Sequence, residues 1–189
     1  MKIKIGLFAM SLLFATPAAA APETYAIDMP HSFSNFEVGH MGITWIRGRF
    51  NKTSGKVTLD RAEKKGSIEA EIDAASVDTG YARRDELLRT ESYFNVAQHP
   101  TMTFRSNNLR FNGDVLVGAD GELTMLGVTR PVSLEIASFK CITHPVNKRE
   151  ICGAVANGMI QRSEFGMTKV SRSISEEIRL YINIEAIKN

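Results

Sequence analysis

Apolar and polar side chains alternate with a period of two along most of this chain. The clearest case is the segment 177–186, in which one face carries Ile178, Leu180, Ile182, Ile184 and Ala186. The same alternation recurs in the segments 36–40, 68–72, 102–104 and 132–136. This period is typical of antiparallel strands that bury one face and expose the other. We therefore expect an all-β protein whose sheet closes into an antiparallel barrel of about eight strands.

Turn-forming residues such as Asn112-Gly113-Asp114 and Ala119-Asp120-Gly121 divide the chain into strand-length runs. We expect strands, some of them merging with a neighbour, at 24–28, 33–41, 44–50, 55–60, 66–73, 101–111, 114–117, 121–126, 131–140, 151–162 and 176–187. No low-complexity linker or internal repeat separates these runs. The pattern predicts a single barrel domain over residues 21–189.

The segment 80–91 breaks the alternation and is rich in helix-forming residues. It predicts a short helix capped by Asp78 or Thr79. Leu87-Leu88 and Tyr93-Phe94 are expected to pack this helix on the barrel or across one of its ends. The adjacent acids Asp85-Glu86 are interpreted as part of its solvated face.

The first twenty residues have the pattern of a secretory signal peptide. Lys2 and Lys4 precede a short apolar run, which ends in Pro17-Ala18-Ala19-Ala20. A membrane anchor is the alternative, but the apolar run is shorter than the ~20 residues that a helical span needs. We expect cleavage after Ala20, a periplasmic mature protein and no stable membrane insertion.

The charges of the chain nearly cancel. It has 23 basic and 21 acidic residues, and two of the basic residues lie in the expected signal peptide. The adjacent pair Arg83-Arg84 is followed at once by two acids. A nucleic-acid-binding protein would instead carry a clustered basic surface. Nucleic acid is therefore not an expected partner.

Two cysteines, Cys141 and Cys152, flank a polar turn between two alternating runs. In an exported protein a disulfide that joins the two strands of a hairpin is the default expectation. The alternatives are half of a zinc site, which needs two further ligands, and a redox dithiol, which normally has Cys-x-x-Cys spacing.

Alternation also selects candidates for the inner wall of the barrel. Phe36, Val38 and His40 share one face of a strand, and Met102, Phe104 and Ser106 share one face of another. They could line a cavity for an apolar ligand, with His40 and Ser106 contacting a polar headgroup. The alternative is that they fill a dry core, which is the commoner fate of Phe and Met.

The sequence contains no pattern that predicts a metal centre or catalysis. The four histidines are spread along the chain without metal-ligand spacing, and no Gly-x-Ser-x-Gly motif is present. His31 and Ser32 are neighbours, but consecutive strand residues point to opposite faces. We expect no metal, no cofactor and no enzymatic activity.

Six motifs occur in a fixed order over about 160 residues. They are Asp28-x-x-His31-Ser32-x-x-x-Phe36-x-Val38-x-His40-x-Gly42, Gly48-x-Phe50, Val77-Asp78-Thr79 with Arg84-Asp85-x-x-Leu88-Arg89, Pro100-x-Met102-x-Phe104-x-Ser106, Gly121-x-Leu123-Thr124-x-x-Gly127-Val128-Thr129-Arg130-Pro131, and Arg162-Ser163-x-Phe165-Gly166-Met167. Through them the chain resembles the YceI-like family of secreted bacterial proteins from Asp28 to its C-terminus.

The resemblance implies an extended, lipocalin-like antiparallel barrel with a long apolar tunnel. The tunnel would hold a polyisoprenoid, an isoprenoid quinone or a similar long-chain amphiphile as a ligand. The resemblance adds Phe50, Met125, Phe165 and Met167 to the ligand-lining candidates, and methionine suits this role because its unbranched side chain adapts to a flexible ligand. The chain departs from the family at Leu87, where His is common, and over Ser92–Asn95. We expect a lipid-binding protein, with an enzyme acting on such a lipid and a ligand-free stress-response barrel as alternatives. The sequence leaves open whether the protein forms a homodimer.

Overall fold

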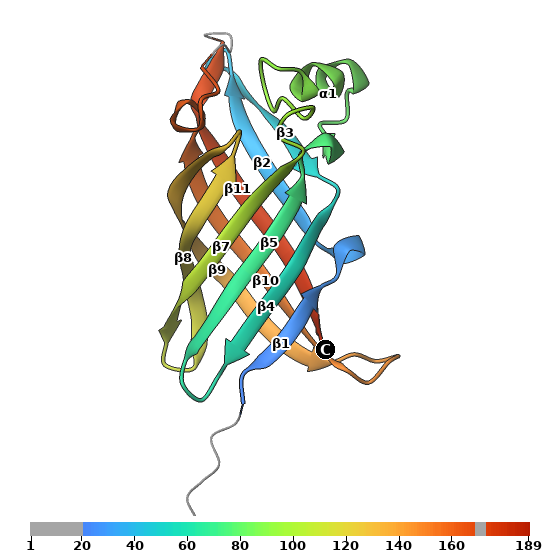
Figure 1. The fold of residues 1–189 in the computed structure, drawn as a ribbon, viewed down its shortest axis with the longest axis vertical. Coiled ribbons are helices and arrows are strands. Elements are labelled where there is room, and N and C mark those ends of the chain that lie inside the picture. The colour runs from blue at the N-terminus through green and yellow to red at the C-terminus, as the bar shows by residue number, and fades with distance from the viewer. Residues whose placement is uncertain (1–20, 169–172) are drawn as a thin grey trace, which may run out of the picture.

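A computed structural model describes residues 21–168 and 173–189 and shows a closed antiparallel barrel (Figure 1). The expected signal peptide, residues 1–20, lies outside the described part of the chain. The strands are β1 (Glu23–Ile27), β2 (Phe33–His40), β3 (Thr44–Phe50), β4 (Thr53–Asp60), β5 (Lys65–Asp73), β6 (Val77–Asp78), β7 (Thr101–Asn112), β8 (Val115–Met125), β9 (Val128–Thr143), β10 (Glu150–Gln161) and β11 (Ile174–Lys188). One α-helix, α1 (Ala82–Arg89), and the 3-10 turns Met29–His31, Ala74–Ser76 and Arg162–Phe165 complete the secondary structure of these described residues.

The eleven strands form eight wall strands, because three of the wall strands are each interrupted once. β1 and β2 form one wall strand, with the 3-10 turn Met29–His31 between them, where Pro30 has no N–H to donate to a ladder. β3 and β4 form the next. β5 and β6 form the third, with the 3-10 turn Ala74–Ser76 between them, since β5 pairs with β4 and β6 pairs with β3. The sheet closes where β1 pairs with β11, with Ile27 opposite Ala186. The predicted all-β barrel of about eight strands is confirmed.

The strand positions follow the alternation closely, with one clear error. Residues 119–121 were predicted as a turn, but they lie inside β8. Gly121 is needed there because a Cβ at this position would lie 2.7 Å from the Phe104 ring and 2.4 Å from a β7 carbonyl oxygen. A glycine in a strand often marks such a close approach rather than a turn.

The predicted helix exists as α1, but its contacts differ from those expected. Tyr81 occupies the N-cap position without a side-chain cap, and Asp85, predicted to be solvated, is buried. The Asp85 carboxylate accepts hydrogen bonds from the backbone N–H and the hydroxyl of Thr79. Leu88 and Phe94 pack on the core, whereas Leu87 is 49% exposed. The carboxylate therefore ties the first turns of α1 to the preceding segment.

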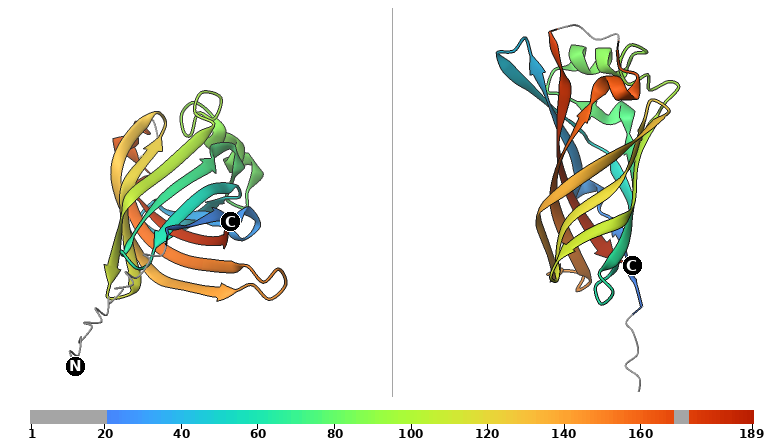
Figure 2. Two further views of the ribbon diagram at one scale, coloured as in Figure 1. Left: turned by 60° about the horizontal axis from the view of Figure 1, so that its bottom comes forward. Right: turned by 90° about the vertical axis from the view of Figure 1, so that its left-hand side faces the viewer.

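The two ends of the barrel are different. α1 and the β2–β3 turn lie at one end, which we call the α1 end, and the start of β1, the C-terminus and the β9–β10 turn lie at the other, the β1 end (Figures 1 and 2). One core cluster, which includes Phe50, Met102 and Phe165, occupies the α1-end half. A second, which includes Tyr25 and Cys152, occupies the β1-end half. Among the helices that the structure describes, none has the length and apolarity to cross a membrane.

Candidate ligand cavity

An apolar cavity runs through the interior of the barrel between the two core clusters. Its volume is about 210 Å³, measured as the space open to the centre of a water molecule. Its lining on β10 extends from Cys152 to Ile160. Eight residues of strand span ~26 Å, or ~20 Å along the axis of a barrel whose strands are tilted by about 40°. The cavity is thus long and narrow, a shape that suits an extended chain rather than a compact ligand.

All eight wall strands contribute apolar side chains to this cavity. In its β1-end half the lining includes Leu59, Leu109, Leu116, Phe139, Cys152 and Ala186. Its middle includes Ile68, Ala70, Phe104, Leu134, Ala156 and Ile182. Its α1-end half includes Phe36, Phe50, Met102, Met125, Ile160 and Met167. Alternation produces this wall, because every second residue of each strand points inward.

Beta-bulges change which residues of a strand face inward. On β7, Met102 and Phe104 line the cavity, but beyond a register shift between Arg105 and Asn108 the lining residue is Leu109. On β9 the lining likewise passes from Ile136 to Phe139. The extra residue of a bulge moves the inward set from even to odd positions. Strict alternation therefore predicts only part of the wall.

Six of the ten predicted lining residues contact the cavity, namely Phe36, Phe50, Met102, Phe104, Met125 and Met167. The other four lie elsewhere. Val38 is buried in the barrel wall, and Phe165 is buried in the Arg162–Phe165 turn. His40 lies at the end of β2, half-buried.

Ser106 is buried, but its hydroxyl is occupied within the β7 bulge. Its Oγ donates to the Asp120 carbonyl oxygen at 2.7 Å and accepts from the Asn108 N–H at 3.2 Å. The Ser106 side chain thus satisfies backbone groups that the bulge removes from the ladder. This geometry places the hydroxyl in a structural role rather than in the lining.

Arg162 is a charged residue in the cavity lining, although it was not among the predicted site residues. Its side chain is only 11% exposed. Nε donates to the Ser175 carbonyl oxygen at 3.0 Å, Nη1 donates to that of Met167 at 2.6 Å, and Nη2 lies 3.1 Å from Glu176. Hydrogen bonds from Ser163, together with the charge of Arg162, hold the pKa of Glu176 below its usual range. Arg162 therefore ties the chain after β10 to the start of β11 at the α1 end.

The connection between β5 and β7 covers part of the α1 end. The Phe94 ring meets Phe50 edge-on, with 5.2 Å between centroids, and lines the cavity. Arg89 fastens this connection, because Nε donates to the Ala75 carbonyl oxygen and Nη2 to that of Val77. The cover is thus held by charge-assisted hydrogen bonds to the backbone.

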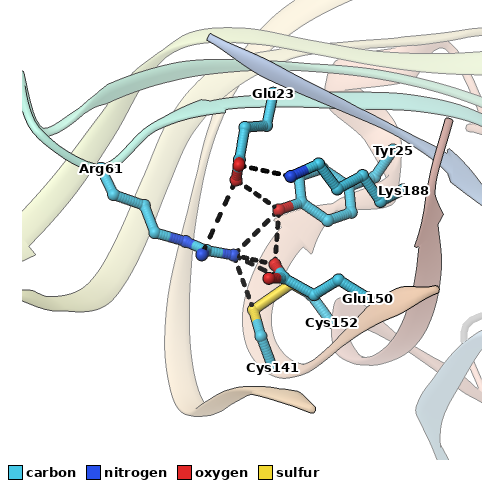
Figure 3. Close-up of a disulfide and its surroundings, with 7 residues drawn as sticks. All are labelled: Glu23, Tyr25, Arg61, Cys141, Glu150, Cys152 and Lys188. Carbon is cyan, nitrogen blue, oxygen red and sulfur yellow. Dashed lines mark hydrogen bonds and ion pairs between the residues drawn. A yellow bond between two sulfur atoms is a disulfide. The ribbon is translucent and has the colours of Figure 1, made fainter. Parts of the chain in front are cut away.

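At the β1 end the cavity stops at Tyr25, which has no exposed surface. Figure 3 shows its hydroxyl among the side chains of Glu23, Arg61 and Glu150. The Tyr25 hydroxyl lies 2.6 Å from Glu150 Oε1 and 2.8 Å from Glu23 Oε2, and it accepts a hydrogen bond from Arg61 at 2.9 Å. Arg61 also pairs with Glu150, and Lys188 pairs with Glu23. We call these five residues the floor network.

The floor network is electrostatically matched. The hydrogen bond from Arg61 is the main cause that lowers the pKa of Glu150, and the hydrogen bond from Lys188 does the same for Glu23. Burial, reinforced by hydrogen bonds to the two carboxylates, raises the pKa of Tyr25. Tyr25 is therefore a neutral phenol at physiological pH, and its hydroxyl, bonded to Glu23, Glu150 and Arg61, caps a largely apolar cavity.

The predicted disulfide between Cys141 and Cys152 is present, with an S–S distance of 2.05 Å. The two cysteines are paired across the β9–β10 hairpin, as expected. Arg61 Nη2 lies 3.3 Å from Cys141 Sγ, so the disulfide adjoins the floor network. The hairpin is therefore fixed at the point where the cavity ends.

The family of the chain follows from sequence and structure together. Residues 25–186 match the YceI-like domain. Protein YceI of Salmonella arizonae is 35% identical over 187 residues, which are 97% of this chain and 96% of that protein.

Three solved structures share the fold. BcnA of Burkholderia cenocepacia superposes with a TM-score of 0.71 at 22% identity, over 84% of this chain and 98% of BcnA. The Campylobacter jejuni YCEI protein superposes with a TM-score of 0.67 at 27% identity, over 79% of this chain and 89% of that protein. A polyisoprenoid binding domain from Saccharophagus degradans, implicated in plant cell wall breakdown, superposes with a TM-score of 0.64 at 19% identity. The match covers 87% of this chain and 98% of that domain. With its barrel, its apolar cavity and this match over most of its length, the chain belongs to the YceI-like family.

Proposed function

We propose that this protein is a periplasmic carrier that holds one long apolar molecule, a polyisoprenoid or an isoprenoid quinone, inside its barrel. The observation that carries the proposal is the cavity, which is lined by apolar side chains from all eight wall strands and closed at the β1 end by the floor network. A narrow apolar cavity of this length matches an extended hydrocarbon chain. The polyisoprenoid binding domain of Saccharophagus degradans has the same fold.

Burial of the ligand chain supplies the affinity. Each methylene moved from water into an apolar site contributes about 0.8 kcal/mol, so one isoprene unit of five carbons contributes about 3–4 kcal/mol. Association itself costs about 4–15 kcal/mol in lost freedom. Short prenyl chains therefore bind weakly, and affinity increases with each added unit until the cavity is full.

Binding is favoured over catalysis because polar side chains of the lining are engaged in hydrogen bonds and an ion pair. Ser34 and Thr53 form a buried hydroxyl pair at 3.1 Å. Arg162 is held by two backbone carbonyls and Glu176. A nucleophile or a general base would need a free, activated side chain in the cavity.

The periplasmic location is supported by two features. The first twenty residues have the pattern of a secretory signal peptide. The Cys141–Cys152 disulfide belongs in an oxidising compartment.

Organic extraction of the protein purified from the periplasm, followed by mass spectrometry, tests the function. We expect one long-chain isoprenoid per protein chain. Delipidation should lower the melting temperature by about 5–10 °C, because a ligand at a hundredfold excess over its Kd adds about 2.7 kcal/mol to the stability of the folded state.

Prenyl compounds of increasing length should restore the melting temperature in order of length. An empty extract together with a melting temperature indifferent to every prenyl compound would reject the carrier function. Conversion of the ligand to a product during incubation would favour an enzyme instead.

A further inference from the structure

The turn between β2 and β3 presents large apolar side chains to solvent at the α1 end. Ile43 is 80% exposed, Met41 61% and Trp45 41%. Figure 2, right, shows this hairpin standing out from the barrel at the end that carries α1. We call residues 41–45 the hairpin tip. Three exposed large hydrophobic residues within five positions form an apolar projection.

The backbone conformation of the hairpin tip is unfavourable for a large apolar residue such as Met41. Ile43 N–H donates to the His40 carbonyl oxygen, and the two central residues of the turn, Met41 and Gly42, have φ of 56° and 72°. Such a turn favours Asn-Gly. A large apolar residue with positive φ is uncommon, and here it also exposes its side chain to water. Folding of the hairpin alone does not call for methionine at this position.

The charges around the hairpin tip suit a phospholipid surface. The ten residues 38–47 contain no carboxylate, and their ionisable groups are His40 and Arg47. The Arg47 side chain is 83% exposed and pairs with Glu37, below the tip. The Arg179 guanidinium lies 3.9 Å from the centre of the Trp45 ring and pairs with Glu177. An apolar tip above a tryptophan and arginines is the arrangement that lies at the boundary of acyl chains and headgroups.

We propose that the hairpin tip docks the protein on a phospholipid bilayer, with Met41 and Ile43 entering the acyl boundary and Trp45, Arg47 and Arg179 at the headgroup level. The proposal deepens the carrier function and rests on it, since a long-chain isoprenoid is dissolved in a membrane before it is bound. The floor network closes the β1 end, so the ligand enters at the α1 end, where the hairpin tip lies. Docking would bring this end to the membrane surface.

Trp45 is the only tryptophan of the chain and therefore reports on the hairpin tip directly. We would add vesicles made of equal amounts of phosphatidylcholine and phosphatidylglycerol to the full mature protein. Emission of Trp45 should shift to shorter wavelength, and lipids brominated on the acyl chains should quench it. Ile43→Ser should weaken partition into these vesicles about tenfold, because the isoleucine side chain no longer leaves water.

The matched control is Val146→Ser. Val146 is 82% exposed at the β9–β10 turn, at the β1 end. Both replaced side chains are exposed, so both variants should keep the wild-type melting temperature. Val146→Ser should bind vesicles like the wild type. An equal loss of vesicle binding in Ile43→Ser and Val146→Ser would overturn the proposal.

Docking and carrier function fail separately in this design. If extraction yields a stoichiometric isoprenoid but Trp45 emission does not change when vesicles are added, the carrier function stands and docking is refuted. Vesicle-dependent quenching with an empty extract supports docking and refutes the carrier. A Trp45 shift that depends on protein concentration without vesicles would assign the hairpin tip to a second copy of the chain and overturn the proposal.

Discussion

Filling the cavity from its wall should stabilise the empty protein and exclude the ligand at the same time. Ala156 lies in the middle of β10, opposite Ile136 of β9 and Ile182 of β11, and its side chain lines the cavity. Ala156→Leu adds three carbons to this space. If they enter an apolar void, they contribute at most about 2.4 kcal/mol, at about 0.8 kcal/mol per carbon.

The assay compares delipidated proteins by thermal unfolding and native proteins by lipid extraction. A gain of about 1–2 kcal/mol, reduced from the maximum for imperfect fit, corresponds to a rise of about 2–8 °C in a domain of this size. The same variant should retain less isoprenoid than the wild type, because the leucine occupies the path of the chain. Stability and ligand content are therefore expected to change in opposite directions.

Ala74→Leu is the matched control. Ala74 is 1% exposed and belongs to the core, but it lies outside the cavity lining. Three extra carbons there meet packed atoms and should destabilise the protein by about 1–3 kcal/mol. If Ala156→Leu destabilises the delipidated protein as much as Ala74→Leu does, the barrel is packed at this level and the cavity argument is refuted.

Three further predictions concern the frame of the cavity. Replacing Cys141 and Cys152 together by alanine should cost about 2.5–3 kcal/mol in urea unfolding, since the bridge closes a loop with a sequence separation of 11; an unchanged midpoint would contradict this. The pKa of Glu150 is lowered in the folded state, so its stabilising effect is present above its usual pKa and is lost as the pH falls through the lower folded value. Melting temperatures measured from about pH 5 to about pH 3 should therefore fall less steeply for Glu150→Gln than for the wild type, and parallel curves would exclude this role. Gly55→Ala should destabilise by about 2–4 kcal/mol, because φ is 135° and a Cβ would lie 2.0 Å from the Glu69 carbonyl oxygen; a stability loss below that of an exposed strand substitution would contradict it.

Period-two alternation was sufficient to predict the fold and much of the cavity wall. Alternation is a local property, since neighbouring residues of any strand point to opposite faces. It therefore placed Phe36, Met102 and Phe104 on the inner face without any knowledge of the partner strands, and the structure finds all three in the lining. Export and hairpin placement likewise predicted the Cys141–Cys152 bridge.

Local patterns failed where a contact between distant segments decides the outcome. The β7 bulge engages the hydroxyl of Ser106 and moves the inward set to Leu109, and it arises from the pairing of β7 with β8. Asp85 looked solvated beside Glu86, but it is buried because Thr79 folds back onto it.

The closure of the cavity depended entirely on tertiary structure. The floor network joins Tyr25, Arg61 and Glu150, which are separated by up to 125 positions in sequence. Arg162 likewise stands in the last of the six motifs without a role that residue order assigns, because two of its partners, the Ser175 carbonyl oxygen and Glu176, come from β11. The amino-acid sequence by itself determined which faces of the strands are apolar, because that depends on residue order alone. The tertiary structure decided where the cavity ends and which polar groups lie in it, because these depend on which distant side chains can pair once the sheet has closed.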